Sequence, residues 1–164
     1  MTDCRAFCHR EEGAAASEMA LMLPLLLAMM FVVFEAGHYF YTEQKVVQAV
    51  REGARYAGRR PFADFPCGGA ASATAISEIK NVTRTGVLTG GTPRISNWDA
   101  NLINVSYTCN AGYATSGIFK GNSGGAPIVT VSAAAGYPSL FESLGLIDSN
   151  TQVFASAQAV VNGI

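Results

Sequence analysis

One apolar segment near the N-terminus constrains the fold more than any other feature of the chain. Residues 19–34 read MALMLPLLLAMMFVVF and contain no charged or hydrogen-bonding side chain. Extended back to Ala14, the segment is interrupted only by Ser17 and Glu18. A helix over residues 14–34 would rise about 31 Å, which matches the hydrocarbon core of a bilayer. The sequence therefore predicts a transmembrane helix over residues 14–35.

Two other interpretations of this segment are weaker. A buried core helix of a small domain normally shows one polar stripe, whereas residues 19–34 are apolar on every side. A secretory signal would end in a small-x-small cleavage motif, and residues 34–38, FEAGH, offer no convincing one. The count of flanking positive charges, taken alone, favours an orientation with the C-terminal side in the cytoplasm. The basic residues are Arg5 and Arg10 before the segment and Lys45, Arg51, Arg55, Arg59 and Arg60 after it.

The charge balance argues against a nucleic-acid partner. Lys and Arg number 11 and Asp and Glu number 12, which gives a net charge of −1 and no field that would attract nucleic acid. Charged residues become sparse after Pro61, where Gly, Ser, Thr, Asn and Ala are common. A chain of 164 residues favours one compact domain plus appendages.

Residues 12–19, which lead into the apolar segment, read EGAAASEM. This sequence resembles a type IV prepilin processing site. In that family a peptidase cuts after the glycine on the cytoplasmic side, and a glutamate stands fifth in the mature chain. The resemblance implies cleavage after Gly13, with Ala14 as the first residue and Glu18 as the fifth.

The first third of the chain contains GAAASEMALMLPLLL and FEAGHYFYTEQKVVQAVREGARYAGRR. These segments are similar, more specifically, to minor pilins (pseudopilins) of the TadE family from the Tad, or Flp, tight-adherence pilus system. The similarity extends more weakly to the C-terminal sequence from Val129 to Val161. It implies a structural protein that takes part in pilus assembly and surface adherence, with no enzymatic activity and no cofactor. A membrane-tethered module that binds an extracytoplasmic ligand is the alternative.

The resemblance also implies partners and a location. The partners would be a prepilin peptidase, other minor pilins, the major pilin and the inner-membrane assembly platform, together with membrane lipid. The location would be the bacterial inner (cytoplasmic) membrane, crossed once, with the N-terminus cytoplasmic and the C-terminal domain periplasmic or extracellular. The expected division is a cytoplasmic leader at 1–13, a transmembrane helix at 14–35, an amphipathic stalk at 36–60 and an exported α+β domain at 61–164.

Glu18 stands at the start of the apolar segment, where an ionisable group needs a partner. A charge inside hydrocarbon costs about 2.5–3.5 kcal/mol or more. The resemblance implies that the partner is the free α-amino group of Ala14 in a neighbouring subunit. Alternatively, Glu18 lies among the lipid headgroups. Pro24, farther along, predicts a kink or local loosening of the helix.

The stalk is predicted to continue the same helix beyond the membrane. Apolar residues recur at helical spacing between Phe40 and Ala57, whereas Gln44, Gln48, Arg51, Arg55 and Arg59 line another face. Residues 58–61, GRRP, end the pattern. One helix from near Ala14 to Ala57 would be about 66 Å long. The stalk should pack against its own domain or a partner helix, although a basic amphipathic face could also lie on a membrane.

The remaining residues predict an α+β fold in which the long transmembrane helix and stalk pack against a small antiparallel β-sheet domain. Expected elements are a short helix at 70–80, strands at 103–109, 128–133 and 153–161, and a short helix or loop at 137–146. Residues 89–93 and 112–127 are rich in Gly, Ser, Asn and Thr and predict turns or loops. Three or more strands should curl against the upper part of the long helix.

The four cysteines divide by position in the chain. Cys4 and Cys8 lie in the leader, where the cytoplasm would keep them reduced, and Cys67 and Cys109 lie in the distal domain. In an exported domain the second pair can form a disulfide worth about 3–4 kcal/mol. The spacing of Cys4, Cys8 and His9 lacks a second pair of ligands, so no metal site is expected.

The chain contains a serine-hydrolase motif but lacks a suitable base for its serine. Residues 121–125, GNSGG, satisfy G-x-S-x-G, but a serine needs a base to take its proton. The histidines are His9, in the leader, and His38, at the membrane exit, and none follows Ser123. The segment is therefore expected to be a flexible loop, and an anchored hydrolase is a remote third possibility.

Overall fold

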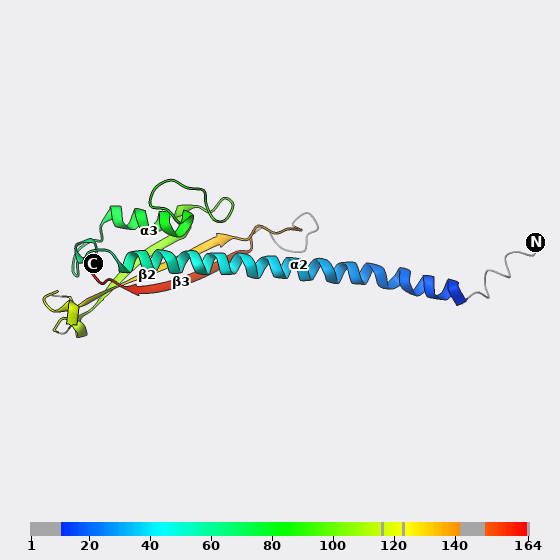
Figure 1. Ribbon diagram of the computed structural model, residues 1–164, viewed down its shortest axis with the longest axis horizontal. Helices are drawn as coiled ribbons and strands as arrows, with labels where there is room; N and C mark the ends of the chain where they lie inside the picture. The colour runs from blue at the N-terminus through cyan, green and yellow to red at the C-terminus, as the bar shows by residue number, and fades with distance from the viewer. Residues whose placement is uncertain (1–10, 116, 123, 142–149, 164) are drawn as a thin grey trace, which may run out of the picture.

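The computed structural model describes residues 11–115, 117–122, 124–141 and 150–163. The longest element is a single helix, α2 (Glu11–Gly58), and the other described elements gather around its C-terminal half (Figure 1). A second helix, α3 (Ala73–Thr85), is followed by three strands, β1 (Ile103–Asn110), β2 (Ala126–Gly136) and β3 (Gln152–Val160). This arrangement confirms the predicted α+β fold with a long N-terminal apolar helix.

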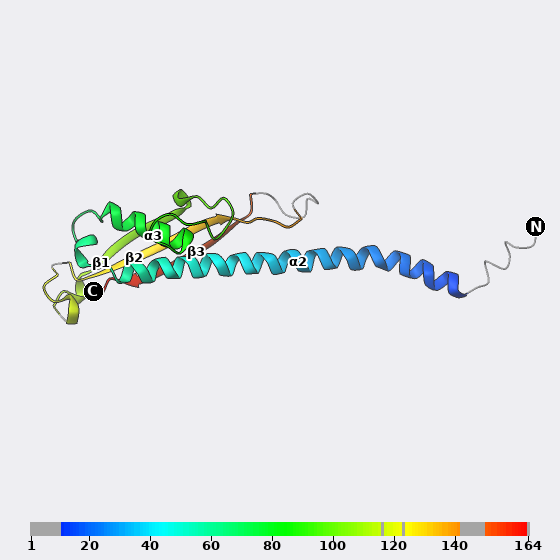
Figure 2. The ribbon, with the colours of Figure 1, turned by 45° about the horizontal axis from the view of Figure 1, so that its top comes forward.

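Helix α2 is continuous through both the apolar segment and the stalk, as predicted. Most of its residues are good helix formers, such as Ala, Leu, Met, Glu and Gln. Pro24 lies inside the helix and cannot donate a backbone hydrogen bond, and Figure 2 shows that the axis bends in the N-terminal half. Gly58 ends the helix, and its carbonyl accepts a hydrogen bond from the Asn162 N–H at 2.8 Å, so the segment after β3 closes the C-terminus of α2.

Helix α3 exists where a helix was predicted but is displaced toward the C-terminus. It begins at Ala73 rather than Ala70, because the Ser72 side chain accepts from the Ala75 N–H and caps the first turn. It ends at Thr85 rather than Lys80, because Gly86 adopts a left-handed conformation (φ 84°) and donates to the Val82 carbonyl.

The three strands form one antiparallel sheet in the order β1-β2-β3. In the register, Val105 of β1 lies opposite Val131 of β2, which in turn lies opposite Ala157 of β3. All three predicted strands are confirmed, and β2 is longer at both ends than expected. The predicted loop at 112–127 contains a short 3-10 turn at Gly117–Phe119. Of the predicted element at 137–146, residues 137–141 form a non-helical loop and the rest lies outside the described residues.

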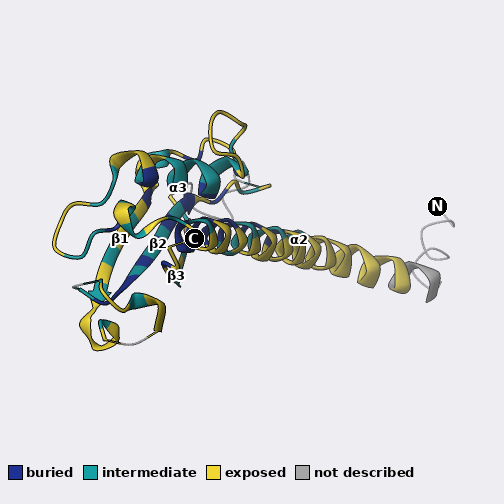
Figure 3. Ribbon diagram, turned by 60° about the vertical axis from the view of Figure 1, so that its left-hand side comes forward, coloured by how far each residue is buried: buried dark blue, intermediate teal, exposed yellow. Residues whose placement is uncertain are grey.

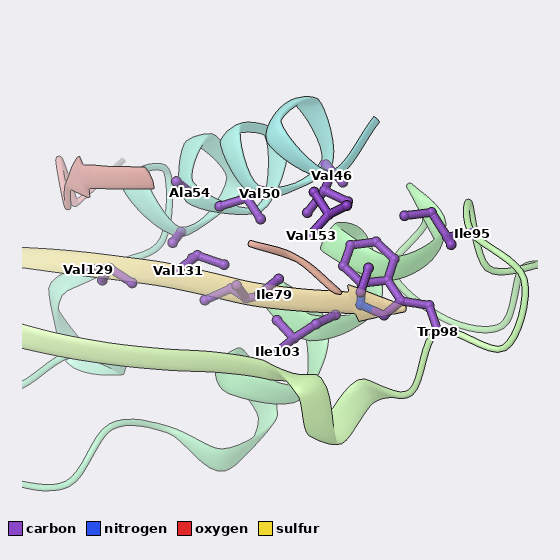
Figure 4. Close-up of a cluster of buried hydrophobic side chains, with 14 of the residues drawn as sticks. Val46, Val50, Ala54, Ile79, Ile95, Trp98, Ile103, Val129, Val131 and Val153 are labelled. Carbon is purple, nitrogen blue, oxygen red and sulfur yellow. The ribbon is translucent and has the colours of Figure 1, made fainter. Parts of the chain in front are cut away.

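The core lies between one face of the sheet and the two helices. Val46, Val50 and Ala54 of α2 and Ile79 of α3 face Val129 and Val131 of β2, and all are buried (Figure 4). Gly53 lets the helices meet closely, since a Cβ atom there would collide with the side chain of Thr83. Thr83 is itself fully buried and donates to the Ile79 carbonyl at 2.8 Å. The stalk is therefore part of the domain, where it packs beside α3 on one face of the sheet, rather than a separate spacer.

Candidate assembly site

The N-terminal half of α2 is exposed on every side. Residues 15–30 and 32–34 have exposed side chains, including every leucine and methionine from Met19 to Met30 (Figure 3). An 18-residue window of this helix has a mean hydropathy of 2.3, and only 6% of it is buried. Apolar surface of this extent needs a non-aqueous environment, and the helix fits a single-pass membrane anchor.

Glu18, whose carboxylate is predicted to need a partner, is exposed near the start of this helix. It lies beside Ala15, Met19 and Met22, and no ion pair joins it to any part of the chain that the structure describes. Gly13 and Ala14, the residues that flank the predicted cleavage site, lie in the first turn of α2. A carboxylate in this position has no counter-charge within its own described chain.

Glu35, at the other end of the apolar segment, has the opposite environment. It is only 3% exposed, and its carboxylate accepts hydrogen bonds from the Tyr137 hydroxyl at 2.8 Å and from the Leu140 N–H at 3.2 Å. The Tyr137 hydroxyl also lies 3.2 Å from Nδ1 of His38. Because the hydroxyl has one proton, the bonds are satisfied together when His38 donates to Tyr137 and Tyr137 donates to Glu35. Burial and the Glu35 carboxylate raise the pKa of Tyr137 above its ordinary value.

The cluster of Glu35, His38 and Tyr137 was not predicted from the sequence. The position of Glu35 beside hydrocarbon was a signal, because a buried carboxylate must find donors. Its main partner, Tyr137, is however separated from it by 102 positions in the chain. Neither helical nor strand periodicity predicts such a pairing.

The C-terminal half of α2 carries an exposed basic ridge, which we define as Arg51, Arg55 and Arg59. These three residues are exposed, and none forms an ion pair with a residue in the described ranges. By contrast, the neighbouring Arg60 turns inward and pairs with Asp64 at 2.7 Å and with Glu78 at 2.6 Å. The polar face predicted for the stalk is therefore available to a partner.

The structure joins Cys67 and Cys109, the pair predicted to form a disulfide, with their α-carbons 5.8 Å apart. The bond ties the segment before α3 to the end of β1. Gly124 lies against it, since a Cβ atom there would collide with Cys67. Cys4, Cys8 and His9 lie outside the described residues.

The residues around the G-x-S-x-G motif at 121–125 give no support to a serine hydrolase. Asn122 and Gly125 form a tight turn before β2, with the Gly125 N–H donating to the Asn122 carbonyl at 2.8 Å, and Ser123 lies outside the described residues. His38 is engaged with Tyr137. Among the residues that the structure describes, no group of three or more His, Cys, Asp or Glu side chains could hold a metal ion.

Together these features define a class: a small α+β domain built around the C-terminal half of a long helix, whose apolar N-terminal half fits a single-pass membrane anchor. The family model described as TadE-like protein matches residues 13–55. The match begins at Gly13 and covers the apolar segment and most of the stalk. It confirms, over these residues, the similarity to the TadE family predicted from the sequence. The family is a pilin-like structural one. Neither the curated proteins nor the solved structures that were searched gave a match to the chain.

Proposed function

We propose that this protein is a pseudopilin, or minor pilin, that takes part in assembling a Tad/Flp-type pilus and in surface adherence. The observation that carries the proposal is the contrast between the two carboxylates that bound the apolar segment. Glu35 is bonded within its own chain, whereas Glu18 has no ion pair with any described residue. A membrane-embedded carboxylate persists only with a partner, and a second subunit can supply one.

The proposed partner of Glu18 is the α-amino group that cleavage between Gly13 and Ala14 would create in a neighbouring subunit. A prepilin peptidase makes this cut, and sister minor pilins, the major pilin and the inner-membrane platform are the further partners. In this scheme residues 1–13 are the leader, 14–35 the span, 36–60 the stalk and 61–164 the exported domain. The N-terminus faces the cytoplasm, and the protein resides in the bacterial inner membrane.

Deletion of the gene followed by complementation tests the proposal. The wild-type gene should restore surface pili counted by electron microscopy, and Glu18→Ala should restore few, although the variant reaches the membrane at normal levels. Glu43→Ala is the matched control, because it removes a carboxylate from the same helix beyond the span, and Glu43 forms no ion pair with a described residue. Normal pili in the deletion strain, or full restoration by Glu18→Ala, would contradict the proposal.

Processing is tested separately by mass spectrometry of the membrane fraction. The mature chain should begin at Ala14, and Gly13→Ala should keep the leader, because a side chain crowds the peptidase site. An intact leader on the wild-type protein, in cells with an active peptidase, would rule out cleavage after Gly13.

One observation favours the alternative, a membrane-tethered ligand-binding module. The sheet face opposite the helices is open, and a hollow of about 430 Å³ lies on it beside Phe154, with Asn104, Ser132 and Ser156 among its lining residues. No residue of the three strands is charged, so the surface suits a neutral ligand. Unchanged piliation in the deletion strain, together with lost ligand binding, would favour this module.

A further inference from the structure

A short segment of the distal domain reaches back to the apolar helix. We define Tyr137–Phe141 as the strap, and we propose that the strap is a second membrane contact, in which Leu140 and Phe141 enter the lipid interface beside the outer end of the span. The inference rests on the membrane anchoring by residues 14–35 that is part of the proposed function. It adds a lipid-binding surface on the domain itself.

The strap lies alongside the last turns of the apolar segment. The ring of Phe141 contacts the ring of Phe31 edge-on, with centroids 5.1 Å apart. The Leu140 N–H bonds to Glu35, and Tyr137 bonds to both Glu35 and His38. Phe31, Glu35 and His38 follow one another at helical spacing and so lie on one face of α2. Phe31 precedes the end of the apolar segment by about one helical turn, roughly 5 Å, so a bilayer around that segment reaches the tip of the strap.

The side chains of the strap suit an interface with lipid. Its sequence, YPSLF, contains no charge, and Leu140 is 55% exposed. Tyrosine, which combines an apolar body with a polar tip, is enriched at the membrane surface, and Tyr41 of α2 is such a residue. Just beyond the span, α2 adds Phe40 and Tyr41, both largely exposed, at the same end of the apolar segment. The strap and these two residues thus form one aromatic and aliphatic collar.

The N–H groups of the strap are paired within the chain. In hydrocarbon each unpaired amide group costs several kcal/mol, and every N–H group of the strap has an acceptor within the chain. Tyr137 donates to the Thr151 carbonyl, Ser139 to the Tyr137 carbonyl, Leu140 to the Glu35 carboxylate and Phe141 to the Ser139 hydroxyl oxygen. Pro138 has no N–H to satisfy. An ordinary surface loop would leave such groups to water, so the pattern supports lipid rather than water as the neighbour of the strap.

Two points of contact would fix the domain with respect to the bilayer. The span alone allows the domain to rotate about the helix axis. A second contact on one side of α2 defines which side of the domain faces the membrane, and it leaves the basic ridge of Arg51, Arg55 and Arg59 farther out, about 25 Å or more beyond Phe34 along the helix. That distance exceeds a Debye length of about 8 Å in physiological salt, so the ridge remains free for a protein partner.

Tryptophan fluorescence of the full chain in phosphatidylcholine vesicles with brominated acyl chains tests the proposal. Leu140→Trp places a probe on the strap. Leu26→Trp is the positive control in the middle of the span, and Leu88→Trp is the control for an exposed position, 48% exposed on a distal loop. The native Trp98 is 2% exposed in the core and supplies a constant background.

We expect bromine to reduce the fluorescence of Leu26→Trp and Leu140→Trp, and to leave Leu88→Trp unchanged. For Leu140→Trp the loss should grow as the bromine atoms are moved toward the headgroups. If Leu26→Trp is quenched and Leu140→Trp behaves like Leu88→Trp, the strap does not touch lipid and the proposal is wrong. The proposal is also wrong if Leu140→Trp is shielded from aqueous acrylamide but not quenched by bromine, because a protein would then cover the strap. If Leu26→Trp itself is not quenched, the membrane span and the proposed function fail together with the strap.

Discussion

The two halves of α2 are one helix in two different environments. From residue 15 to residue 34 nearly every side chain is exposed, whereas in the second half Val46, Ala49, Val50, Ala54 and Ala57 are buried against the sheet and α3. The first half is apolar all round, and the second has one apolar stripe and one charged ridge. The comparison teaches that the same backbone structure presents a surface suited to lipid in one half and is stabilised by the chain's own domain in the other. Damage to one half should therefore leave the other intact.

The largest effect is expected from a charge in the buried half. Val50 is fully buried, and Val50→Asp would place a carboxylate without a partner in the core, which should cost about 4 kcal/mol or more. The domain should unfold or become protease-sensitive, while the protein still inserts into the membrane. Limited proteolysis in vesicles measures both. Gln48→Asp, a change on the outer side of the same helix, should leave the domain resistant, and equal sensitivity of the two variants would contradict this assignment of the core.

Loss of the disulfide should have the next largest effect, again confined to the domain. Cys67→Ser opens a loop with a sequence separation of 42 residues, which should lower the free energy of unfolding by about 3–4 kcal/mol. Thermal unfolding of the detergent-solubilised protein measures the loss. In the wild-type protein, thiol reagents should modify Cys67 and Cys109 only after reduction. Labelling of both without reductant would mean that the bond does not form in the cell.

A charge in the exposed half should impair membrane insertion and leave the stability of the domain unchanged. Leu26 is near the middle of the span and is exposed in the isolated chain, so Leu26→Arg should cost about 3 kcal/mol of insertion and nothing in domain stability. The membrane-bound fraction should fall, and the unfolding temperature of the domain in detergent should stay at the wild-type value. Leu26→Val is the control. If Leu26→Arg destabilised the domain instead, this half of α2 would be packed in protein.

The smallest effect is expected at the junction of the two halves. Tyr137→Phe removes the hydroxyl that donates to Glu35, which should cost about 1–2 kcal/mol. Since the pKa of Tyr137 is raised in the folded state, its contribution should be fully present below about pH 10 and be lost only as the pH rises further. Chemical denaturation at neutral pH measures the loss. Tyr41→Phe, on the exposed side of α2, should match the wild type, and an equal loss in both variants would remove the special role of Tyr137.

The sequence predicted the elements whose signal is local. The helix through the apolar segment follows from the length and uniform apolarity of that segment, and the strand beginning at Ile103 follows from its two-residue alternation. The ends of α3 differ from the predicted ones because Ser72 and Gly86 cap the helix. The contacts of Glu35 with Tyr137 and of Gly53 with Thr83 could not be predicted, because they join residues far apart in the sequence and depend on how the sheet lies on the helix. The site divides in the same way: Glu18 was singled out by its position in the chain, whereas Glu35 was recognised only in the folded structure.

Labelling with a membrane-impermeant maleimide tests the central claim, that one helix passes from lipid into an exported domain, most directly. In spheroplasts producing the chain with Cys4 and Cys8 replaced by serine, Arg51→Cys and Leu26→Cys would be compared. We expect Arg51→Cys, on the exposed ridge, to react in intact spheroplasts and Leu26→Cys not to react, even after lysis. Reaction of Leu26→Cys at the rate of Arg51→Cys would mean that the apolar half lies in water, and reaction of Arg51→Cys only after lysis would mean that the domain remains in the cytoplasm.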